Sequence, residues 1–202
     1  MRGRFLAFEG GEACGKSTQA ARLAVRLGAL LTHEPGDTPL GAEIRRLVLD
    51  SPTLDITDRA EALLMAADRA QHVVEVIRPA LEAGRTVITD RFAGSSVAYQ
   101  GHGRLLRAGE VEQLSRWATD DLWPDLIVLL EVPLSVSAAR TGGARDRVEE
   151  AGDAFHARVH DGFLTQAIAD PDRWAVVDGT QPEADVADAI WQIIQIRFPD
   201  IV

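Results

Sequence analysis

The chain contains a single lysine, Lys16, beside twenty arginines. This lysine lies in the segment Gly10-Gly11-Glu12-Ala13-Cys14-Gly15-Lys16-Ser17, which fits the phosphate-loop pattern G-x-x-x-x-G-K-[ST] at every fixed position. A compact ammonium charge suits the β- and γ-phosphates of a nucleotide, whereas a planar guanidinium replaces it poorly. The motif therefore predicts that the chain binds a nucleoside triphosphate.

The loop offers several kinds of phosphate ligand. Its glycines let backbone amides point inward around an anion, and the helix that follows directs its positive end to the same point. Lys16 is expected to neutralise phosphate oxygens, and the Ser17 hydroxyl to ligate Mg²⁺. The predicted nucleotide-binding residues are Gly10, Gly11, Glu12, Ala13, Cys14, Gly15, Lys16, Ser17 and Thr18.

A second anion site is predicted at Asp90-Arg91-Phe92, directly after a strand-like segment. Ligands of open α/β folds bind at the carboxyl edge of the sheet, where these residues would lie. Arg91 is expected to hold the phosphate of an acceptor with two hydrogen bonds, and Asp90 to hold Mg²⁺ through water. The alternative, an ordinary ion pair at a strand end, is less favoured at this position.

An acceptor site distinguishes a kinase from a GTPase switch. A guanine-binding GTPase usually carries an Asn-Lys-x-Asp motif that reads the base. The chain has no asparagine and no second lysine, so this motif cannot be present. A kinase is therefore the preferred reading, and a nucleotide-gated switch without catalysis is the alternative.

The sequence around Arg69 allows two roles for this residue. It shares one helix face with Met65 and Val73, at spacings of i, i+4 and i+8. An arginine on an apolar stripe either extends its charged end to solvent or meets an anion. The first interpretation is the more frequent one.

A glycine-rich, charged segment, Thr141–Asp153, is the most loop-like part of the chain and is predicted to be a mobile lid. Arg140, Arg145 and Arg147 cluster there, and a mobile arginine can stabilise the charge that develops in phosphoryl transfer. A solvated loop whose arginines pair with neighbouring glutamates is equally consistent with the composition.

The composition limits the class of protein. A length of 202 residues suits one domain, predicted to span residues 1–202, and the net charge of -10 disfavours a nucleic-acid surface. One cysteine excludes an internal disulfide, and we find neither a signal peptide nor a membrane-spanning run, so a cytoplasmic location is expected. Cys14 is favoured as a small residue at a variable loop position over a redox-active thiol.

Strand and helix signals alternate along the chain, which predicts a P-loop NTPase-type parallel sheet with helices on both faces. The expected strands are Arg4–Phe8, Ala29–Thr32, Arg85–Thr89, Leu126–Val132 and Trp174–Val177. The expected helices are Lys16–Leu27, Leu40–Leu49, a long helix from a Thr57 cap through Ile77 that Pro79 kinks or restarts before Gly84, Glu110–Thr119, Leu134–Arg140, Asp153–Ala169 and Ala184–Arg197.

Nearly the whole chain, from Arg4 to about Trp191, resembles the thymidylate kinase family, whose members phosphorylate dTMP with ATP. Its landmarks are Phe8–Gln19 around the phosphate loop, Glu34-Pro35-Gly36-Asp37-Thr38-Pro39-Leu40-Gly41, Ala67-Asp68-Arg69, Asp90-Arg91-Phe92, Ser95-Ser96-Val97-Ala98-Tyr99-Gln100-Gly101 and Asp146-Arg147-Val148-Glu149. Many families share the phosphate loop, but the later segments in this order are far more specific.

The resemblance implies a set of roles at the substrate site. Glu12 would meet the 3′-hydroxyl of the acceptor sugar, and Arg91 would bind the dTMP phosphate. Tyr99 would crowd the 2′ position and so favour deoxyribose. The substrate-binding residues implied are Glu12, Glu34, Met65, Arg69, Arg91, Ser96, Tyr99 and Gln100, with Arg69 at the phosphate or the thymine edge and with Ser96 and Gln100 at the base.

The resemblance also indicates a subgroup. Some members carry a catalytic arginine in the phosphate loop at the position that is Ala13 here, so this chain resembles those that supply the basic group from the lid. Lys16, Arg91, Glu12 and either Arg145 or Arg147 are the implied catalytic residues, and Ser17 and Asp90 the implied Mg²⁺ ligands. Family members are commonly homodimers.

Three positions depart from the family pattern. Met65 replaces a phenylalanine that often stacks on thymine, which leaves a kinase for dUMP or CMP as an alternative. His33 replaces an arginine, and Asp37 replaces a glycine. Since an aspartate near an anion site weakens phosphate binding, Asp37 is expected to point away or to pair with an arginine. The segment Thr180-Gln181-Pro182 is predicted to contact the purine of ATP, on the sole ground that it follows the last strand.

Overall fold

The computed structural model describes residues 2–51, 54–140 and 147–201. Five strands form one sheet in the order β2-β3-β1-β4-β5, and every neighbouring pair is parallel. The strands are β1 (Phe5–Glu9), β2 (Leu30–His33), β3 (Val87–Asp90), β4 (Leu126–Glu131) and β5 (Trp174–Asp178). The predicted fold class is therefore confirmed, with strand bounds that differ by one or two residues from those expected.

The central strand β1 is buried from end to end, because helices cover both faces of the sheet. Its side chains alternate between two apolar clusters. Phe5 and Ala7 belong to the cluster on one face, and Leu6 and Phe8 belong to the cluster on the other. This explains why the strand reads as a continuous apolar run instead of an alternating one.

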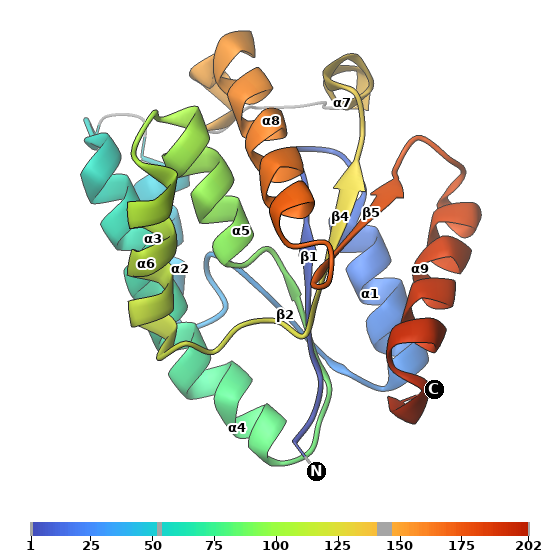
Figure 1. The fold of residues 1–202 in the computed structure, drawn as a ribbon. Helices are drawn as coiled ribbons and strands as arrows, with labels where there is room; N and C mark the ends of the chain where they lie inside the picture. The colour runs from blue at the N-terminus through green and yellow to red at the C-terminus, as the bar shows by residue number, and fades with distance from the viewer. Residues whose placement is uncertain (1, 52–53, 141–146, 202) are drawn as a thin grey trace.

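Two helices, α1 (Lys16–Leu27) and α9 (Glu183–Arg197), pack against one face of the sheet and contact each other. Figure 1 shows them on one side of the strands, with the other long helices on the opposite side and α7 beyond the end of β4. The long helices on the opposite side are α2 (Pro39–Leu49), α3 (Asp58–His72), α6 (Ala108–Thr119) and α8 (Asp153–Ala169). The shorter helices are α4 (Arg78–Glu82), α5 (Ala93–Ser96) and α7 (Leu134–Arg140).

The long helix expected from Thr57 onward is present. The Thr57 hydroxyl accepts a hydrogen bond from the amide of Ala60 at 3.4 Å and caps α3. The helical path then runs through a π-helical segment, Val73–Ile77, into α4. Pro79 lies in the first turn of α4, where its missing N–H is least costly, so the helical path continues past the proline to Glu82.

A helical segment that the sequence did not indicate follows β3. It consists of α5 and a π-helical stretch, Val97–Gly103. The stretch is rich in glycine, which disfavours a helix. Close packing explains the glycines: a Cβ on Gly103 would lie 2.6 Å from the ring of Phe155 in α8, and one on Gly101 would lie 3.0 Å from Ala108. Tertiary contact therefore decides the conformation here.

Among the residues that the structure describes, no helix combines the length and the apolar character needed to cross a lipid bilayer.

Candidate active site

The predicted anion sites lie together at the carboxyl edge of the sheet. Strands β1 and β3 are neighbours, with Phe8 aligned with Asp90. The chain leaves β1 towards one face through α1 and leaves β3 towards the other through α5. The loops after β1 and β3 therefore diverge, and a pocket lined by Glu12 and Arg91 opens beside them, in the crevice where ligands of open α/β sheets bind.

The phosphate loop has the backbone that its glycines predict. Gly10 has a φ of 145°, and a Cβ there would lie 2.6 Å from the carbonyl oxygen of Leu130. Gly15, with a φ of 95°, precedes α1. Lys16 is only 6% exposed, and its Nζ donates to the carbonyl oxygen of Gly11 at 2.9 Å. The loop thus curls around its own lysine, so a chance glycine-rich turn is a poor explanation of the motif.

Ser17 and Asp90 offer a partial metal site. The Ser17 hydroxyl donates to Asp90 Oδ2 at 2.5 Å, while Asp90 Oδ1 is buried and has no hydrogen bond. The described residues contain no cluster of three His, Cys, Asp or Glu side chains that would hold a metal. Mg²⁺ prefers oxygen ligands and completes its shell with water and nucleotide phosphates. A hydroxyl beside an unpaired carboxylate oxygen fits such an ion.

Arg91 connects the phosphate loop to the other side of the crevice. Its φ of 71° is rare for a residue with a Cβ, and hydrogen bonds fix it, since Arg91 N donates to the carbonyl oxygen of Phe8 at 2.9 Å. Its guanidinium donates to Glu12 Oε1 at 2.5 Å and to the carbonyl oxygen of Gly10 at 3.2 Å. It also donates to the Tyr99 hydroxyl at 3.3 Å.

Glu12 is held as a carboxylate. Burial raises its pKa, but the positive charges of Arg91 and Lys16 and a hydrogen bond from Tyr99 outweigh burial and lower the pKa to about 2. The Tyr99 hydroxyl donates to Glu12 Oε1 at 2.7 Å, and burial raises the pKa of this tyrosine well above its usual value. Glu12 therefore acts at neutral pH as an acceptor for donors around it.

Glu9 is a residue of the site that the sequence reasoning missed. Its side chain is fully buried, and Oε1 accepts hydrogen bonds from the amides of Phe92 at 3.0 Å and Ser95 at 2.9 Å. The Ser95 hydroxyl donates to Oε2 at 2.6 Å. Burial raises the Glu9 pKa to about 7, although Ser95 and the charge of Arg91 act in the opposite sense. An acidic residue that ends a buried strand was the available signal.

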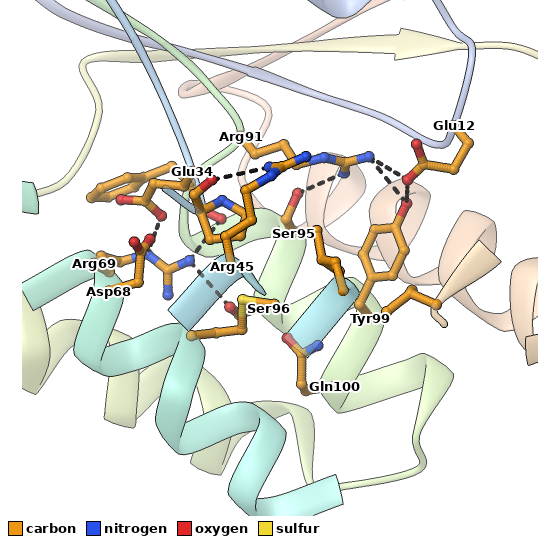
Figure 2. Close-up of a pocket in the computed structure, with 15 residues that line it drawn as sticks. Glu12, Glu34, Arg45, Asp68, Arg69, Arg91, Ser95, Ser96, Tyr99 and Gln100 are labelled. Atoms are coloured by element: carbon orange, nitrogen blue, oxygen red, sulfur yellow. Dashed lines mark hydrogen bonds and ion pairs between the residues drawn. The ribbon is translucent and has the colours of Figure 1, made fainter. Parts of the chain in front are cut away.

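One pocket contains all eight substrate-binding residues that the family resemblance implied (Figure 2). Its lining consists of Glu12, Glu34, Pro35, Arg45, Leu49, Met65, Asp68, Arg69, Arg91, Phe92, Ser95, Ser96, Tyr99, Gln100 and Val148. Figure 2 shows Glu12 and Arg91 at one end and Arg69 and Asp68 at the other. The pocket thus runs from the phosphate loop into the space between α3 and the segment after β3.

Arg69 is neither exposed nor unpaired. It is 3% exposed, its Nε donates to Glu34 Oε2 at 2.9 Å, and one terminal nitrogen donates to Ser96 Oγ and to the carbonyl oxygen of Phe92, each at 3.1 Å. The other terminal nitrogen donates to Ser115 Oγ at 3.1 Å. The solvent-reaching interpretation is therefore wrong, and Arg69 forms part of the pocket wall.

Two charged residues of the pocket were not predicted. Arg45 donates to the carbonyl oxygen of Pro35 at 3.0 Å, and Asp68 accepts from the amide of Gly36 at 3.0 Å. Burial and the neighbouring charge of Glu34 raise the pKa of Asp68 to about 6. Both side chains belong to helices of ordinary charged sequence, so only the fold reveals that they face the pocket.

One of the two expectations for Asp37 was an ion pair with an arginine, and among the residues that the structure describes no arginine pairs with it. It accepts a hydrogen bond from the Thr32 hydroxyl and lies 3.6 Å from His33 Nδ1. Two of the three residues that depart from the family pattern, His33 and Asp37, are therefore neighbours.

The predicted lid lies partly outside the described residues, and Arg145 falls in that part. Arg147 is described: its Nε donates to the carbonyl oxygen of Val48 at 2.9 Å, and its terminal nitrogen binds Glu61. Arg140 donates to the carbonyl oxygen of Gly179 at 2.9 Å. Of the two described arginines, Arg140 is thus bound just before the expected lid and Arg147 is bound within it.

The turn after β5 lies against the phosphate loop. A Cβ on Gly179 would approach the carbonyl oxygen of Cys14 to 3.2 Å. Thr180 and Gln181 are hydrogen-bonded to Asp178. Cys14 itself is 2% exposed and belongs to the apolar cluster beneath the loop, which fits the favoured reading of a small packing residue.

Comparisons with known proteins agree with one another. A family model described as thymidylate kinase matches residues 8–190. A thymidylate kinase of Bifidobacterium longum (strain NCC 2705) is 48% identical over 209 residues, covering 100% of both chains. One from Leifsonia xyli subsp. xyli is 52% identical over 196 residues, covering 93% of this chain and 92% of the relative. The crystal structure of thymidylate kinase from Ehrlichia chaffeensis is 29% identical, with a TM-score of 0.79, and the match covers 96% of this chain and 100% of that one.

Proposed function

Because the chain belongs to the thymidylate kinase family, it transfers the γ-phosphoryl group of ATP to dTMP, and we propose that the pocket of Figure 2 holds the dTMP. The observation that carries the proposal is the convergence of all eight implied substrate residues on one pocket. This pocket begins at Glu12 and Arg91, so an acceptor phosphate there would face the phosphate loop. Two nucleotides can thus meet end to end in the crevice.

In this proposal the triphosphate of ATP lies in the phosphate loop, where Lys16 exchanges its bond with Gly11 for phosphate oxygens. Ser17 and the unpaired oxygen of Asp90 would hold Mg²⁺, which neutralises charge on the phosphates. The turn at Thr180-Gln181-Pro182 stays a positional prediction for the purine.

The acceptor phosphate is proposed to bind Arg91, with Arg45 as a second cation at the pocket wall. Arg91 is already aimed by Glu12 and Tyr99, so little ordering is needed on binding. Tyr99 would exclude a 2′-hydroxyl, and Met65 would pack on the base. Arg69, oriented by Glu34 and Ser96, would donate its one remaining N–H, on the terminal nitrogen that bonds Ser115, to the base or phosphate.

Catalysis in this arrangement rests on alignment and charge neutralisation. The oxygen that attacks belongs to a phosphate that is already ionised near neutral pH, so no strong general base is required. We propose that the chain is a single kinase domain, that its lid spans Thr141–Asp153, and that Arg145 or Arg147 supplies the basic group that Ala13 lacks. Closure would exclude water, which otherwise competes as the acceptor.

A homodimer and a cytoplasmic location are further parts of the proposal. Large apolar side chains are exposed on neighbouring elements: Leu63 on α3 is 57% exposed and Trp117 on α6 is 83% exposed. Such a face is typical of a surface that a second subunit covers.

The proposal is tested by an acceptor panel with purified enzyme, ATP and Mg²⁺, in which ADP formation is followed for dTMP, dUMP, dCMP and TMP with a 2′-hydroxyl. We expect dTMP to be preferred and the ribonucleotide to be used poorly. Equal use of both sugars would contradict the role of Tyr99. A monophosphate-independent ADP release would favour a nucleotide switch instead.

Arg91→Ala is the matching variant. Loss of a charge-assisted contact with the acceptor phosphate should lower kcat/KM for dTMP by about 100-fold or more, while KM for ATP changes only a few-fold. The exposed Arg107→Ala, whose partner is Glu110, serves as the control. Unchanged dTMP kinetics in Arg91→Ala would remove the acceptor phosphate from this end of the pocket.

A further inference from the structure

Glu61 is a buried carboxylate to which no role has yet been given. It lies on α3 and is fully buried, and three side chains donate to it. Gln100 Nε2 donates to Oε1 at 2.9 Å, Arg104 donates to both oxygens at 3.3 and 3.1 Å, and Arg147 binds Oε2. One carboxylate therefore joins α3, the helical segment after β3 and Arg147 of the expected lid.

The surroundings keep Glu61 ionised. Burial raises its pKa, but the hydrogen bonds from Gln100, Arg104 and Arg147 and the charge of Arg104 together lower it below its usual value. An ionised carboxylate can only accept hydrogen bonds. The amide nitrogen of Gln100 must therefore face Glu61, whichever way the glutamine would otherwise turn.

The hydrogen bond from Gln100 Nε2 to Glu61 fixes the direction of the Gln100 carbonyl oxygen. Gln100 lines the substrate pocket. Among the described residues its Oε1 accepts no hydrogen bond, and it is not one of the fully buried unpaired atoms. The carbonyl oxygen is thus open to the pocket and presents a lone pair to whatever occupies it.

We propose that Glu61 is a positioning residue for base selection: through Gln100 it presents a hydrogen-bond acceptor that chooses a pyrimidine with an N–H at its ring edge. The inference rests on the proposed function, in which the base of dTMP enters this pocket. Thymine carries N3–H, a donor, whereas N3 of cytosine is an acceptor. A fixed carbonyl oxygen pairs with the first and opposes the second, and a mismatched polar contact in a buried site costs about tenfold or more in affinity.

The test compares dTMP and dCMP on the full-length enzyme, through the ratio of their kcat/KM values and the ratio of their dissociation constants. In Glu61→Gln the new carboxamide can donate or accept, so the Gln100 amide is free to reverse. We expect the preference for dTMP over dCMP to fall by about tenfold. A ratio equal to that of the wild type would overturn the proposal.

Asp58→Asn is the matched control. Asp58 Oδ1 lies 3.7 Å from Arg104, so this variant also removes a carboxylate beside that arginine, but Asp58 makes no hydrogen bond with Gln100. Its dTMP preference should equal that of the wild type. An equal loss of preference in Asp58→Asn would mean that the charge around Arg104, and not the orientation of Gln100, sets the selectivity.

A double-mutant cycle separates positioning from folding. Gln100→Ala should lower the same ratio, and Glu61→Gln added to it should change the ratio no further. A second, independent loss in the double variant would overturn the route through Gln100.

If Glu61→Gln fails to fold, Glu61→Asp keeps the charge between the arginines but moves the carboxylate away from the Gln100 amide, with the same expected loss of preference. Wild-type enzyme that does not phosphorylate dTMP would overturn the proposed function and this inference together, whereas normal dTMP turnover with unaltered ratios would overturn only the inference.

Discussion

At the scale of single residues, Lys16 and Arg91 are cations with different requirements. Lys16 is buried within a curled loop and bonds the carbonyl oxygen of Gly11, a space that a compact ammonium fits. Arg91 spreads its guanidinium over Glu12, Gly10 and Tyr99, which requires a planar group with several donors. The same net charge therefore does not make the two residues interchangeable.

Lys16→Arg tests this distinction. The variant keeps the charge but places a larger planar group in the loop, so we expect ADP formation to fall by about 100-fold to 1000-fold, close to the effect of Lys16→Ala. The converse change on the exposed face of the same helix, Arg22→Lys, should leave the rate within about twofold, since Arg22 pairs only with Glu183 at the surface. Substantial activity in Lys16→Arg would show that charge alone suffices.

At the scale of the elements, the close approach of the phosphate loop to β4 depends on Gly10. A Cβ there would meet the carbonyl oxygen of Leu130, and the φ of 145° is unfavourable for any other residue. Gly10→Ala should lower the free energy of unfolding by about 2–3 kcal/mol in urea titration. Gly11→Ala, where a Cβ would meet nothing within 4 Å, should change stability by less than about 1 kcal/mol. Similar losses in both variants would disprove this packing argument.

The junction of β1 with α5 is predicted to depend on pH through Glu9. Its pKa is about 7 in the folded chain and 4.5 ordinarily, so the folded state binds the proton more tightly. Its contribution to stability is complete below pH 4.5 and is lost as pH rises through 7, by about 3 kcal/mol at most. In Glu9→Gln this slope should disappear.

Urea unfolding at about pH 5 and about pH 7.5 measures the effect as the difference between wild type and variant. Asp68, whose pKa is raised to about 6, contributes a slope of the same sign in both proteins and cancels in the comparison. Parallel pH dependences in the wild type and Glu9→Gln would contradict the assignment.

The sequence allowed prediction of the elements whose signals are local. The apolar runs correctly predicted the five strands, and the glycines together with Lys16 correctly predicted the loop between β1 and α1. The helical segment after β3 was missed, because its glycines are explained only by the closeness of α8 and α6. Glu9 and Glu61 were missed because each bonds a partner that is distant in the chain, although the position of Glu9 at the end of a buried strand was a usable signal. Arg45 and Asp68 lie on helices of ordinary charged sequence, and only the fold places them at the pocket.

At the scale of the whole molecule, the exposed apolar side chains of α3 and α6 predict self-association. Trp117→Glu places a charge on this exposed side of α6 and should convert a dimer into a monomer in sedimentation velocity. Ile196→Glu is a matched control, because Ile196 is 81% exposed on α9, on the other side of the sheet. A monomeric wild type, or dissociation by both variants, would rule out an interface at α3 and α6.

Because Lys16 is the only lysine of the sequence and is buried, cleavage after it reports local opening of the phosphate loop. A protease that cuts only after lysine has one target in the entire polypeptide, the peptide bond that begins α1. Since a backbone must unwind locally to enter a protease, every cleavage records one opening of the nucleotide cradle. At protease concentrations where cleavage outpaces reclosing, the rate of cleavage after Lys16 therefore measures how often the cradle opens, without any dye, tag or engineered residue.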